Sequence, residues 1–381
     1  MKRLILCISV FLIGFVLFSP VSAQLMDDTD RQGSQHSIFP LVGYTTDYGL
    51  FGGGVYQRIN YADSRRPFLS NMMVDVTGST KGKWAARVDY ERIEMFSRPI
   101  RNRTIVDLEL NPIRSYFGIG NNTLYTREDL DDGLYYLNQQ HALVTFEART
   151  PLFDITGESA LDGALRLKTS YTSATEDGEE TRFYTDPPSH FDAGWVNTLG
   201  AGLLFDSREN EFAPKSGQRH EIGIDISSSL FGSSYSFYEL FADLSYYLSP
   251  LENTVLAQRF TARHNIGDTP FWELPALGSS RGLRGFALDR FMGDSSVLYM
   301  AELRQWLVSF LDDEIRLGAH LFFDTGRVFS EFDSNELFDE WKRTWGVGGA
   351  MTLFSPDLIF RGEVGFSGED YRIYAGVGYA F

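Results

Sequence analysis

Apolar and polar residues alternate along most of the chain from Ile38 onward. The C-terminal segment shows the pattern best. Its apolar set is Tyr371, Ile373, Ala375, Val377, Tyr379 and Phe381, and the intervening set is Arg372, Tyr374, Gly376, Gly378 and Ala380. Segments 238–248 and 315–324 repeat the alternation. A period of two predicts β-strands with one apolar and one polar face.

Sixteen such strands are predicted. They span residues 38–46, 49–61, 67–78, 82–91, 102–112, 136–149, 160–172, 195–206, 217–230, 235–248, 253–266, 295–310, 315–325, 341–353, 357–366 and 370–381. An even count suits a single-chain bacterial barrel and places both ends in the periplasm. The long connections 113–135, 173–194, 267–294 and 326–340 then all lie outside the cell, and short turns such as 63–67, 249–250 and 355–356 lie in the periplasm. The predicted fold is all-β, a transmembrane antiparallel barrel.

The N-terminus resembles a secretory signal. Lys2 and Arg3 precede an apolar stretch from Leu4 to Phe18, and Val21-Ser22-Ala23 forms a small-residue cleavage site. We therefore expect a signal peptide at 1–23 that is cleaved after Ala23. Residues 24–37 would form a short periplasmic lead-in, and residues 38–381 the barrel. No later apolar run reaches the ~18 residues of a spanning helix.

The amino-acid composition limits the kinds of partner and site that the chain can have. Phe, Tyr and Trp make up 15% of the chain, as aromatic girdles at membrane interfaces would require. Removing Lys2 and Arg3 takes the net charge from −17 to −19, which disfavours a nucleic-acid partner. Cys7 is the only cysteine, so the mature chain has no disulfide and no thiolate metal site. We expect no metal and no cofactor.

Four motifs stand out. A loop segment contains Arg281, Gly282, Arg284, Gly285 and Phe286. The strand after it carries Glu302 and Arg304, and the next strand ends in Asp324 and Gly326. Upstream, a periplasmic turn carries Asp206, Arg208, Pro214 and Gly217.

These motifs, in this order, resemble those of the superfamily of BamA, TamA and the two-partner-secretion transporters, the bacterial surface-antigen barrels. The resemblance covers about residues 38–381 and places the Arg-Gly-Phe segment in the sixth extracellular loop. It implies that this loop folds into the lumen, where its arginine binds acidic side chains of the wall. It also implies an outer-membrane location and a role in inserting or translocating proteins. The POTRA domains that normally precede such barrels are not visible in the sequence, which leaves that role open.

Alternation places Glu302 and Asp324 on the polar, inward face of their strands. If the hairpin between them turns at Asp313, residues 302 and 324 lie opposite each other. Two inward carboxylates at one level repel each other. A planar guanidinium would resolve this with charge-assisted, bidentate hydrogen bonds. We therefore predict that Arg284 locks the loop to Glu302 and Asp324, while Gly282 and Gly285 let the loop turn sharply against the wall.

The seam between the first and last strands is a second candidate site. Pro40 cannot donate to a ladder, and Gly43, Gly376 and Gly378 weaken strand packing. In the family, a weak seam is thought to open sideways and accept a client strand. Alternatively, Pro40 only marks where the first strand begins. Phe381 resembles the terminal aromatic signal by which the barrel-assembly machinery inserts such proteins.

Other functions remain open. One is a passive diffusion channel with weak cation preference, and another is a structural surface-antigen barrel. Enzymatic activity is not expected, because His264 and His320 have no recognisable catalytic partners and are interpreted as polar lining. The expected partners are outer-membrane lipid, the assembly machinery, and client proteins or a separate periplasmic partner.

Overall fold

The computed structural model describes residues 33–61, 68–154, 160–176, 178–211, 213–311, 315–330, 339–353 and 359–381. The predicted signal peptide and the lead-in up to residue 32 lie outside these ranges. So do the predicted turns at 63–67 and 355–356.

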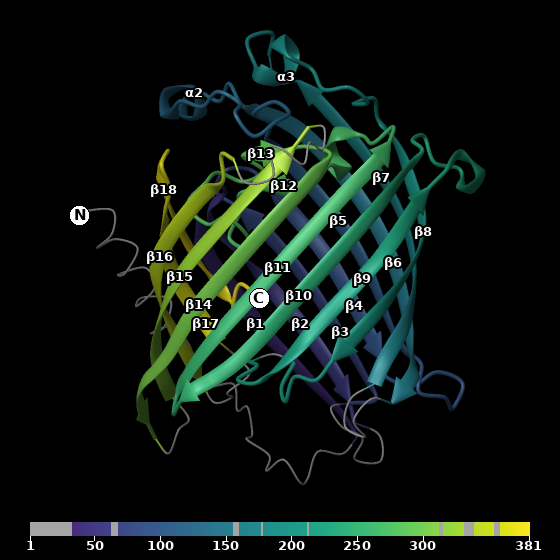
Figure 1. Ribbon diagram of the computed structural model, residues 1–381, viewed down its shortest axis with the longest axis vertical. Coiled ribbons are helices and arrows are strands. Elements are labelled where there is room, and N and C mark those ends of the chain that lie inside the picture. Colours follow the sequence, from purple (N-terminus) through teal and green to yellow (C-terminus); the bar gives the residue numbers. More distant parts are fainter. Residues whose placement is uncertain are drawn as a thin grey trace.

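Sixteen strands close into one antiparallel barrel, which confirms the predicted fold and strand count (Figure 1). Neighbours in the chain pair with each other, and the first barrel strand pairs with the last. The barrel strands are β1 (Ser34–Thr45), β2 (Gly49–Asn60), β3 (Ser70–Ser79), β4 (Trp84–Arg92), β5 (Arg101–Ser115), β6 (Tyr136–Asp154), β7 (Ala160–Glu176), β8 (Gly194–Asp206), β9 (Gly217–Ser227), β10 (Phe237–Leu251), β11 (Thr254–Gly267), β14 (Ser295–Phe310), β15 (Ile315–Phe329), β16 (Lys342–Leu353), β17 (Ile359–Phe366) and β18 (Tyr371–Val377).

The long connections at one end of the barrel carry the remaining elements, which are α2 (Arg127–Asp131), α3 (Arg182–Thr185), η1 (Ser229–Phe231), η2 (Phe271–Glu273) and the two-stranded sheet of β12 (Ala276–Leu277) and β13 (Phe291–Met292). Within the described ranges, no helix has the length and apolarity needed to cross a membrane.

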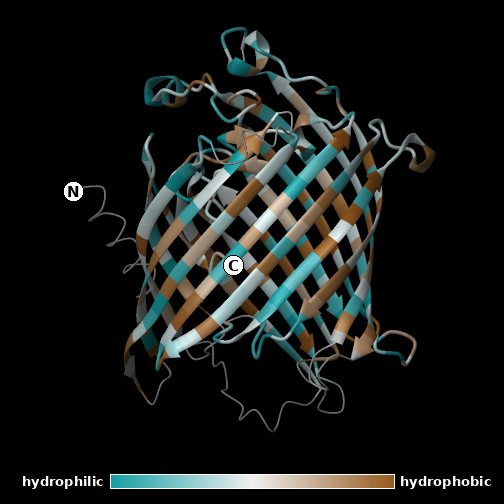
Figure 2. Cartoon of the chain, viewed as in Figure 1, coloured by the Kyte–Doolittle hydropathy of each residue, from teal (hydrophilic) through white to brown (hydrophobic). Residues whose placement is uncertain are grey.

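The two faces of the wall differ as the alternation predicts. Large apolar side chains are exposed on the outside of the wall. Hydrophobic (brown) and hydrophilic (teal) residues accordingly alternate along the strands in Figure 2. Inside, charged residues of adjacent strands pair across the ladder. Arg103 binds Asp89 at 2.6 Å, and Arg259 binds Asp243 at 2.6 Å. Such pairing suits a lumen, because charges on the hydrocarbon side would be costly.

The first strand begins at Ser34, four residues before the predicted start, so the end of the predicted lead-in belongs to the barrel. These residues are polar, so they show no alternation of apolar and polar positions that would predict a strand. They pair with β2 from Ser34↔Asn60 onward.

The last strand ends at Val377, not at Phe381 as predicted. Gly378 has φ +80°, a left-handed conformation that glycine adopts readily, and its N–H donates to the Ile359 carbonyl at 2.8 Å. The chain then turns into the lumen, where Tyr379 stacks on Arg304. Phe381 packs there against a buried apolar cluster, which consists of Leu277, Leu283, Phe286, Phe291, Leu298, Met300, Val328 and Ala380. The prediction that Tyr379 and Phe381 face outward with Tyr371 was therefore wrong.

The register between β14 and β15 also differs from the prediction. Glu302 pairs with Phe322, and Asp324 pairs with Met300. Phe310 pairs with Ile315, which displaces the register by one residue at the hairpin, and the shift between Trp306 and Val308 displaces it by one more. Glu302 and Asp324 both still face the lumen, but diagonally rather than directly opposite.

Candidate functional site

The connection between β11 and β14, residues 268–294, reaches the lumen wall through its central segment 281–286. Arg284 is fully buried there. Its Nε and Nη2 donate to the two oxygens of Asp324 at 2.9 and 2.7 Å, and its backbone N–H donates to the same carboxylate at 3.0 Å. Nη1 donates to Glu302 and lies 3.4 Å from Glu363. The structure thus brings together Arg284, Glu302 and Asp324.

An aromatic ring completes the Arg284 pocket. The guanidinium carbon lies 3.6 Å from the ring centroid of Phe322, which faces inward on β15 between His320 and Asp324. A flat cation can stack on this ring and bond carboxylates in its own plane at the same time. A lysine ammonium could not reproduce that geometry.

Glu363 and His320 extend the network, and sequence reasoning missed both as partners of the loop. His320 Nε2 lies 3.1 Å from Glu363, and Arg361 pairs with the same carboxylate at 3.4 Å. Alternation on β17 would place Glu363 inward, but the sequence gives no means of choosing it from the other inward acids.

Arginines and carboxylates meet in this buried group. Three arginines, Arg284, Arg304 and Arg361, meet three carboxylates, Glu302, Asp324 and Glu363. Donor atoms of Glu302, His320 and Glu363 lie within 4.8 Å of one another, a spacing that a metal ion could use. However, Nη1 of Arg284 contacts both carboxylates, so the guanidinium already supplies the positive charge.

Gly285 and Phe286 hold the loop against the wall. Gly285 has φ +107°, and a Cβ there would lie 2.9 Å from the Phe366 carbonyl carbon. A Cβ on Gly365 would likewise lie 2.8 Å from Gly285 N, so two glycines allow the backbones to touch. Phe286 packs edge-on against Phe291 at 5.0 Å within the apolar cluster.

We expect Gly285→Ala to displace the loop tip, because both the positive φ and the backbone contact exclude a methyl group. The barrel should lose resistance to heat unfolding, measured by its heat-modifiable mobility on gels. Gly368→Ala is the matched control, since nothing lies within 4 Å of a Cβ at that position. Equal thermal shifts in the two variants would contradict this role of Gly285.

The other loop residues lie apart from the acids. Arg281 is exposed to the lumen, and none of the described acids forms an ion pair with it. Gly282 lies against Leu298, and Gly326 lies against the Val297 carbonyl and Leu277. These two glycines allow close packing, whereas Arg281 is not part of the lock.

The motif after β8 forms a self-contained turn. Arg208 binds Asp206 through two hydrogen bonds of 2.9 and 2.6 Å. Pro214 is buried, and Gly217 has φ +95° with a Cβ position only 2.2 Å from the Ser207 carbonyl oxygen. These contacts give the motif a structural role.

The sequence did not reveal that this turn is also tied to β5. Arg101 holds Glu211 by hydrogen bonds of 2.7 and 2.8 Å. Burial opposes ionisation of Glu211, but the hydrogen bonds and charge of Arg101 outweigh it and hold the pKa of this carboxyl below its usual range.

The seam is the least regular junction of the barrel. Its ladder contains two residue pairs, Tyr44↔Ala375 and Thr45↔Tyr374, whereas β1 and β2 pair over twelve. Within the described ranges, β1 from His36 to Gly43 pairs with β2 but has no ladder pair with β18. Pro40 lies in that part of β1.

Glycines mark the limits of the paired region. Gly43 lies where pairing stops, and a Cβ there would be 2.7 Å from the Ala375 carbonyl oxygen. On the other strand, Gly376 has no atom near its Cβ position, and Gly378 begins the inward turn. Gly43, Gly376 and Gly378 therefore lie next to the paired residues of the seam, whereas Pro40 lies farther along β1, opposite Gly54 of β2.

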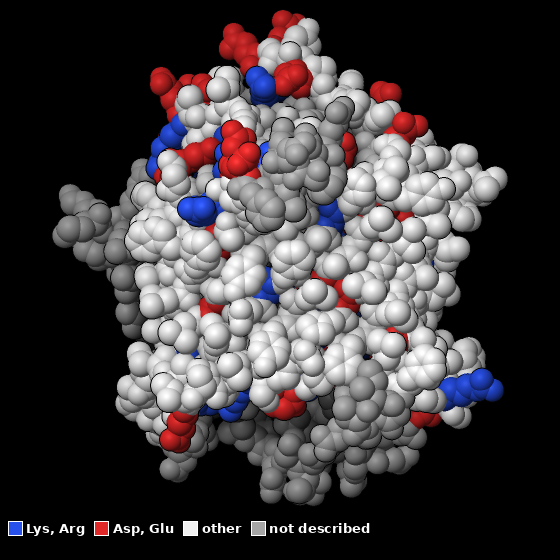
Figure 3. Space-filling model, in the orientation of Figure 1, with Lys and Arg blue, Asp and Glu red and all other residues white. Residues whose placement is uncertain are grey.

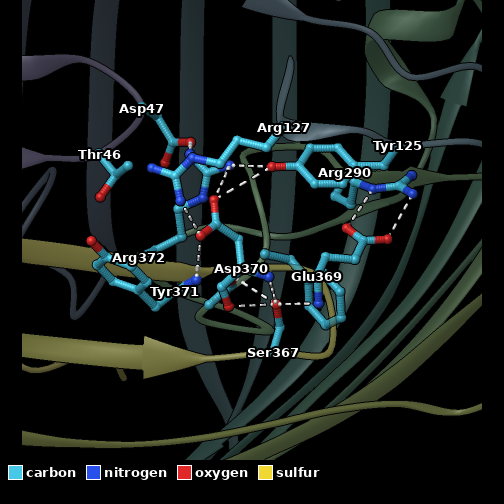
Figure 4. A network of polar contacts seen from close by, with 12 residues as sticks. Thr46, Asp47, Tyr125, Arg127, Arg290, Ser367, Glu369, Asp370, Tyr371 and Arg372 are labelled. Atoms are coloured by element: carbon cyan, nitrogen blue, oxygen red, sulfur yellow. Dashed lines mark hydrogen bonds and ion pairs between the residues drawn. The ribbon is translucent and has the colours of Figure 1, made fainter. Parts of the chain in front are cut away.

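Hydrogen bonds and ion pairs fasten the loop end of this seam (Figure 4). Thr46 N–H donates to the Ile373 carbonyl at 3.1 Å, and Ile373 N–H donates to Thr46 Oγ1 at 2.9 Å. Arg372 pairs with Asp47 at 3.3 Å, which joins β18 to the turn after β1.

Two loops close over this junction. Tyr125 accepts a hydrogen bond from Arg372 at 3.3 Å, and Arg127 binds Asp370 at 2.7 Å. Arg290, which follows Arg284 in the connection 268–294, binds both carboxylate oxygens of Glu369 at 2.8 Å. The seam is thus tied down at the loop end, and its ladder ends at Tyr44.

Comparison with known proteins agrees with this geometry. A family model described as the Omp85 superfamily domain matches residues 101–381. BamA from Haemophilus ducreyi lacking POTRA domains 1–3 is a similar solved structure, with 14% identity and a TM-score of 0.58 over 92% of this chain and 71% of that one. CdiB from Escherichia coli is 14% identical, with a TM-score of 0.59 over 89% of this chain and 62% of that one. CdiB from Acinetobacter baumannii is 10% identical, with a TM-score of 0.57 over 92% of this chain and 60% of that one.

The chain spans less than two thirds of either CdiB chain. Comparison with curated protein sequences gives no significant match. At these identities the structures share the fold with this chain, whereas the family model covers most of the barrel, including the Arg284 lock and β18. The chain belongs to the Omp85 superfamily of outer-membrane barrels.

Proposed function

We propose that this barrel helps polypeptides to insert into or cross the outer membrane, without enzymatic activity, through a sideways opening at the seam. The observation that carries the proposal is the two-pair ladder between β1 and β18. An unpaired strand edge offers a row of backbone N–H and C=O groups to another chain. An incoming strand could add to β1 by β-augmentation.

The lock complements this role by keeping the lumen closed. Arg284 joins the loop to β14, β15 and β17 at once, so the loop cannot leave without breaking contacts on three strands. If the lumen is closed, a polypeptide can enter the membrane only through the wall of the barrel. This arrangement supports the assembly role over the passive diffusion channel.

The C-terminal end supports the seam from inside. Arg304 donates to a backbone oxygen of Phe381 at 2.8 Å, and Phe381 packs with the apolar cluster beneath the loop. Because these residues enter the lumen, β18 is too short to cover the rest of β1. In this proposal, any role of Phe381 as a recognition signal for the assembly machinery ends once the barrel has folded.

A vesicle assay tests the proposal. The purified protein is reconstituted into lipid vesicles, a small unfolded outer-membrane barrel is added from urea, and its folding is followed by gel mobility. We expect folding to be several-fold faster than in vesicles that contain a porin at the same protein density. Equal rates would contradict the proposed role.

A further inference from the structure

The connection between β9 and β10 differs from the other outer loops in charge. No charged residue occurs from Ile226 to Tyr238, although 22% of the chain is charged. The connection 113–135 carries Glu128, Asp129 and Asp131 instead. Acidic groups crowd the upper end of the barrel in Figure 3, while the loop that projects to the side is white.

The tip of this connection presents two apolar side chains. Leu230 is 90% exposed and Phe231 is 44% exposed. In Figures 1 and 2 the loop extends sideways from the upper end of the wall near β8 and ends in brown. It therefore reaches beyond the barrel wall and not over the lumen.

Hydrogen bonds fix this display. The Ser228 hydroxyl caps η1 by accepting from Leu230 N–H at 3.2 Å, and Gly232 ends the turn at φ +77°. Ser233 ties the loop to β8, since its hydroxyl donates to the Asn197 carbonyl at 2.9 Å. The loop is thus held in place by polar contacts, with Leu230 on its surface.

The loop continues an aromatic belt on the outer face. Trp195 is 50% exposed and its ring centroid lies 5.2 Å from that of Tyr171, which is 38% exposed. Ser234 N–H donates to the Trp195 carbonyl at 2.7 Å, so the loop is attached directly at this belt. Aromatic residues at such positions mark the membrane–water interface of outer-membrane barrels.

From these observations we propose that Leu230 and Phe231 insert into the outer leaflet and anchor this side of the barrel between lipid acyl chains. The inference rests on the proposed placement of the barrel in the outer membrane. An apolar tip without charge, level with an aromatic belt, fits the apolar edge of a leaflet better than water. A second copy or another protein would instead require partner contacts that exclude lipid.

Spin-label accessibility tests the proposal. The mature chain lacks cysteine, so Leu230→Cys and, separately, Phe231→Cys can each be labelled with a nitroxide and reconstituted into phosphatidylcholine vesicles. Collision with oxygen, which is concentrated in lipid, is compared with collision with a water-soluble nickel complex. Leu240→Cys on the outer face of β10 is the lipid control. Leu124→Cys, 77% exposed in the connection 113–135, is the water control.

We expect both loop positions to resemble Leu240, with an oxygen-to-nickel ratio several-fold higher than at Leu124. If labels at both loop positions give the ratio found at Leu124 while the label at Leu240 reports lipid, the proposed lipid anchor is wrong, but the placement of the barrel in the membrane is supported. Shielding from both reagents would indicate a protein contact and would also overturn the anchor. If Leu240 itself reports water, the membrane placement and the anchor fall together.

Discussion

Replacing Arg284 by alanine is expected to open the lumen and to destabilise the barrel. The substitution leaves Asp324, Glu302 and Glu363 buried without their shared cation. Removing one partner of a buried ion pair typically costs about 3–5 kcal/mol. The loop tip would then lose its main attachment to β14 and β15.

Two measurements check this expectation. Planar-bilayer recordings should show low, flickering conductance for the unmodified protein and a sharp rise for Arg284→Ala. The temperature of the heat-modifiable transition should fall in the same variant. Arg284→Lys should behave almost as badly, because lysine keeps the charge but loses the bidentate bonds and the flat stacking on Phe322.

Arg281→Ala is the matched control. It removes a guanidinium from the same loop, but that guanidinium is exposed to the lumen and not buried against the wall. Its conductance and heat stability should stay close to those of the unmodified protein. A steadily open channel before any substitution would favour the diffusion-channel alternative. Unchanged conductance and stability in Arg284→Ala would show that the lock does not hold the loop.

Most of the architecture could be read from the sequence. The period of two survives in nearly every strand because one face meets lipid and the other meets charged neighbours, and this gives the strand count and the inward face of Glu302 and Asp324. The arginine that meets them was found through a resemblance in motif order. Alternation alone could not have chosen it from the many loop arginines.

The errors have local physical causes. The predicted register between Glu302 and Asp324 is wrong by two residues. One residue arises at the hairpin, where Phe310 pairs with Ile315, and the other arises at the shift beside Trp306, and alternation reveals neither. The C-terminal turn was missed because Tyr379 and Phe381 continue the alternation. Their inward position depends on Arg304 and on the apolar cluster under the loop, which are long-range contacts.

The same limit applies to the contacts at the loop end. Asp47 and Arg372 are 325 residues apart in sequence, and Arg290 and Glu369 are 79 residues apart. Pairs of this kind depend on closure of the barrel and on the placement of loops over it. Local sequence patterns carry no record of them.

The second large effect is expected at the seam. Opening must break the pairs Tyr44↔Ala375 and Thr45↔Tyr374, because these are the ladder pairs that close the described barrel. A disulfide between Tyr44→Cys and Ala375→Cys would hold the two strands together across directly opposed positions. Insertion of a client strand beside β1 would then be blocked along the paired region.

A matched disulfide controls for the crosslink itself. Val76 and Ala86 are directly opposed on β3 and β4, inside an intact ladder of nine pairs. Val76→Cys with Ala86→Cys therefore adds a disulfide without touching the seam. Its effect on client folding should be small.

The most direct test is the rate at which vesicles containing the oxidised Tyr44→Cys/Ala375→Cys variant fold an added unfolded barrel. We expect the acceleration to be lost, to return when the disulfide is reduced, and to persist in the oxidised Val76→Cys/Ala86→Cys control. If the oxidised seam variant folds the added barrel as fast as the unmodified protein, sideways opening at the seam is not how this protein works.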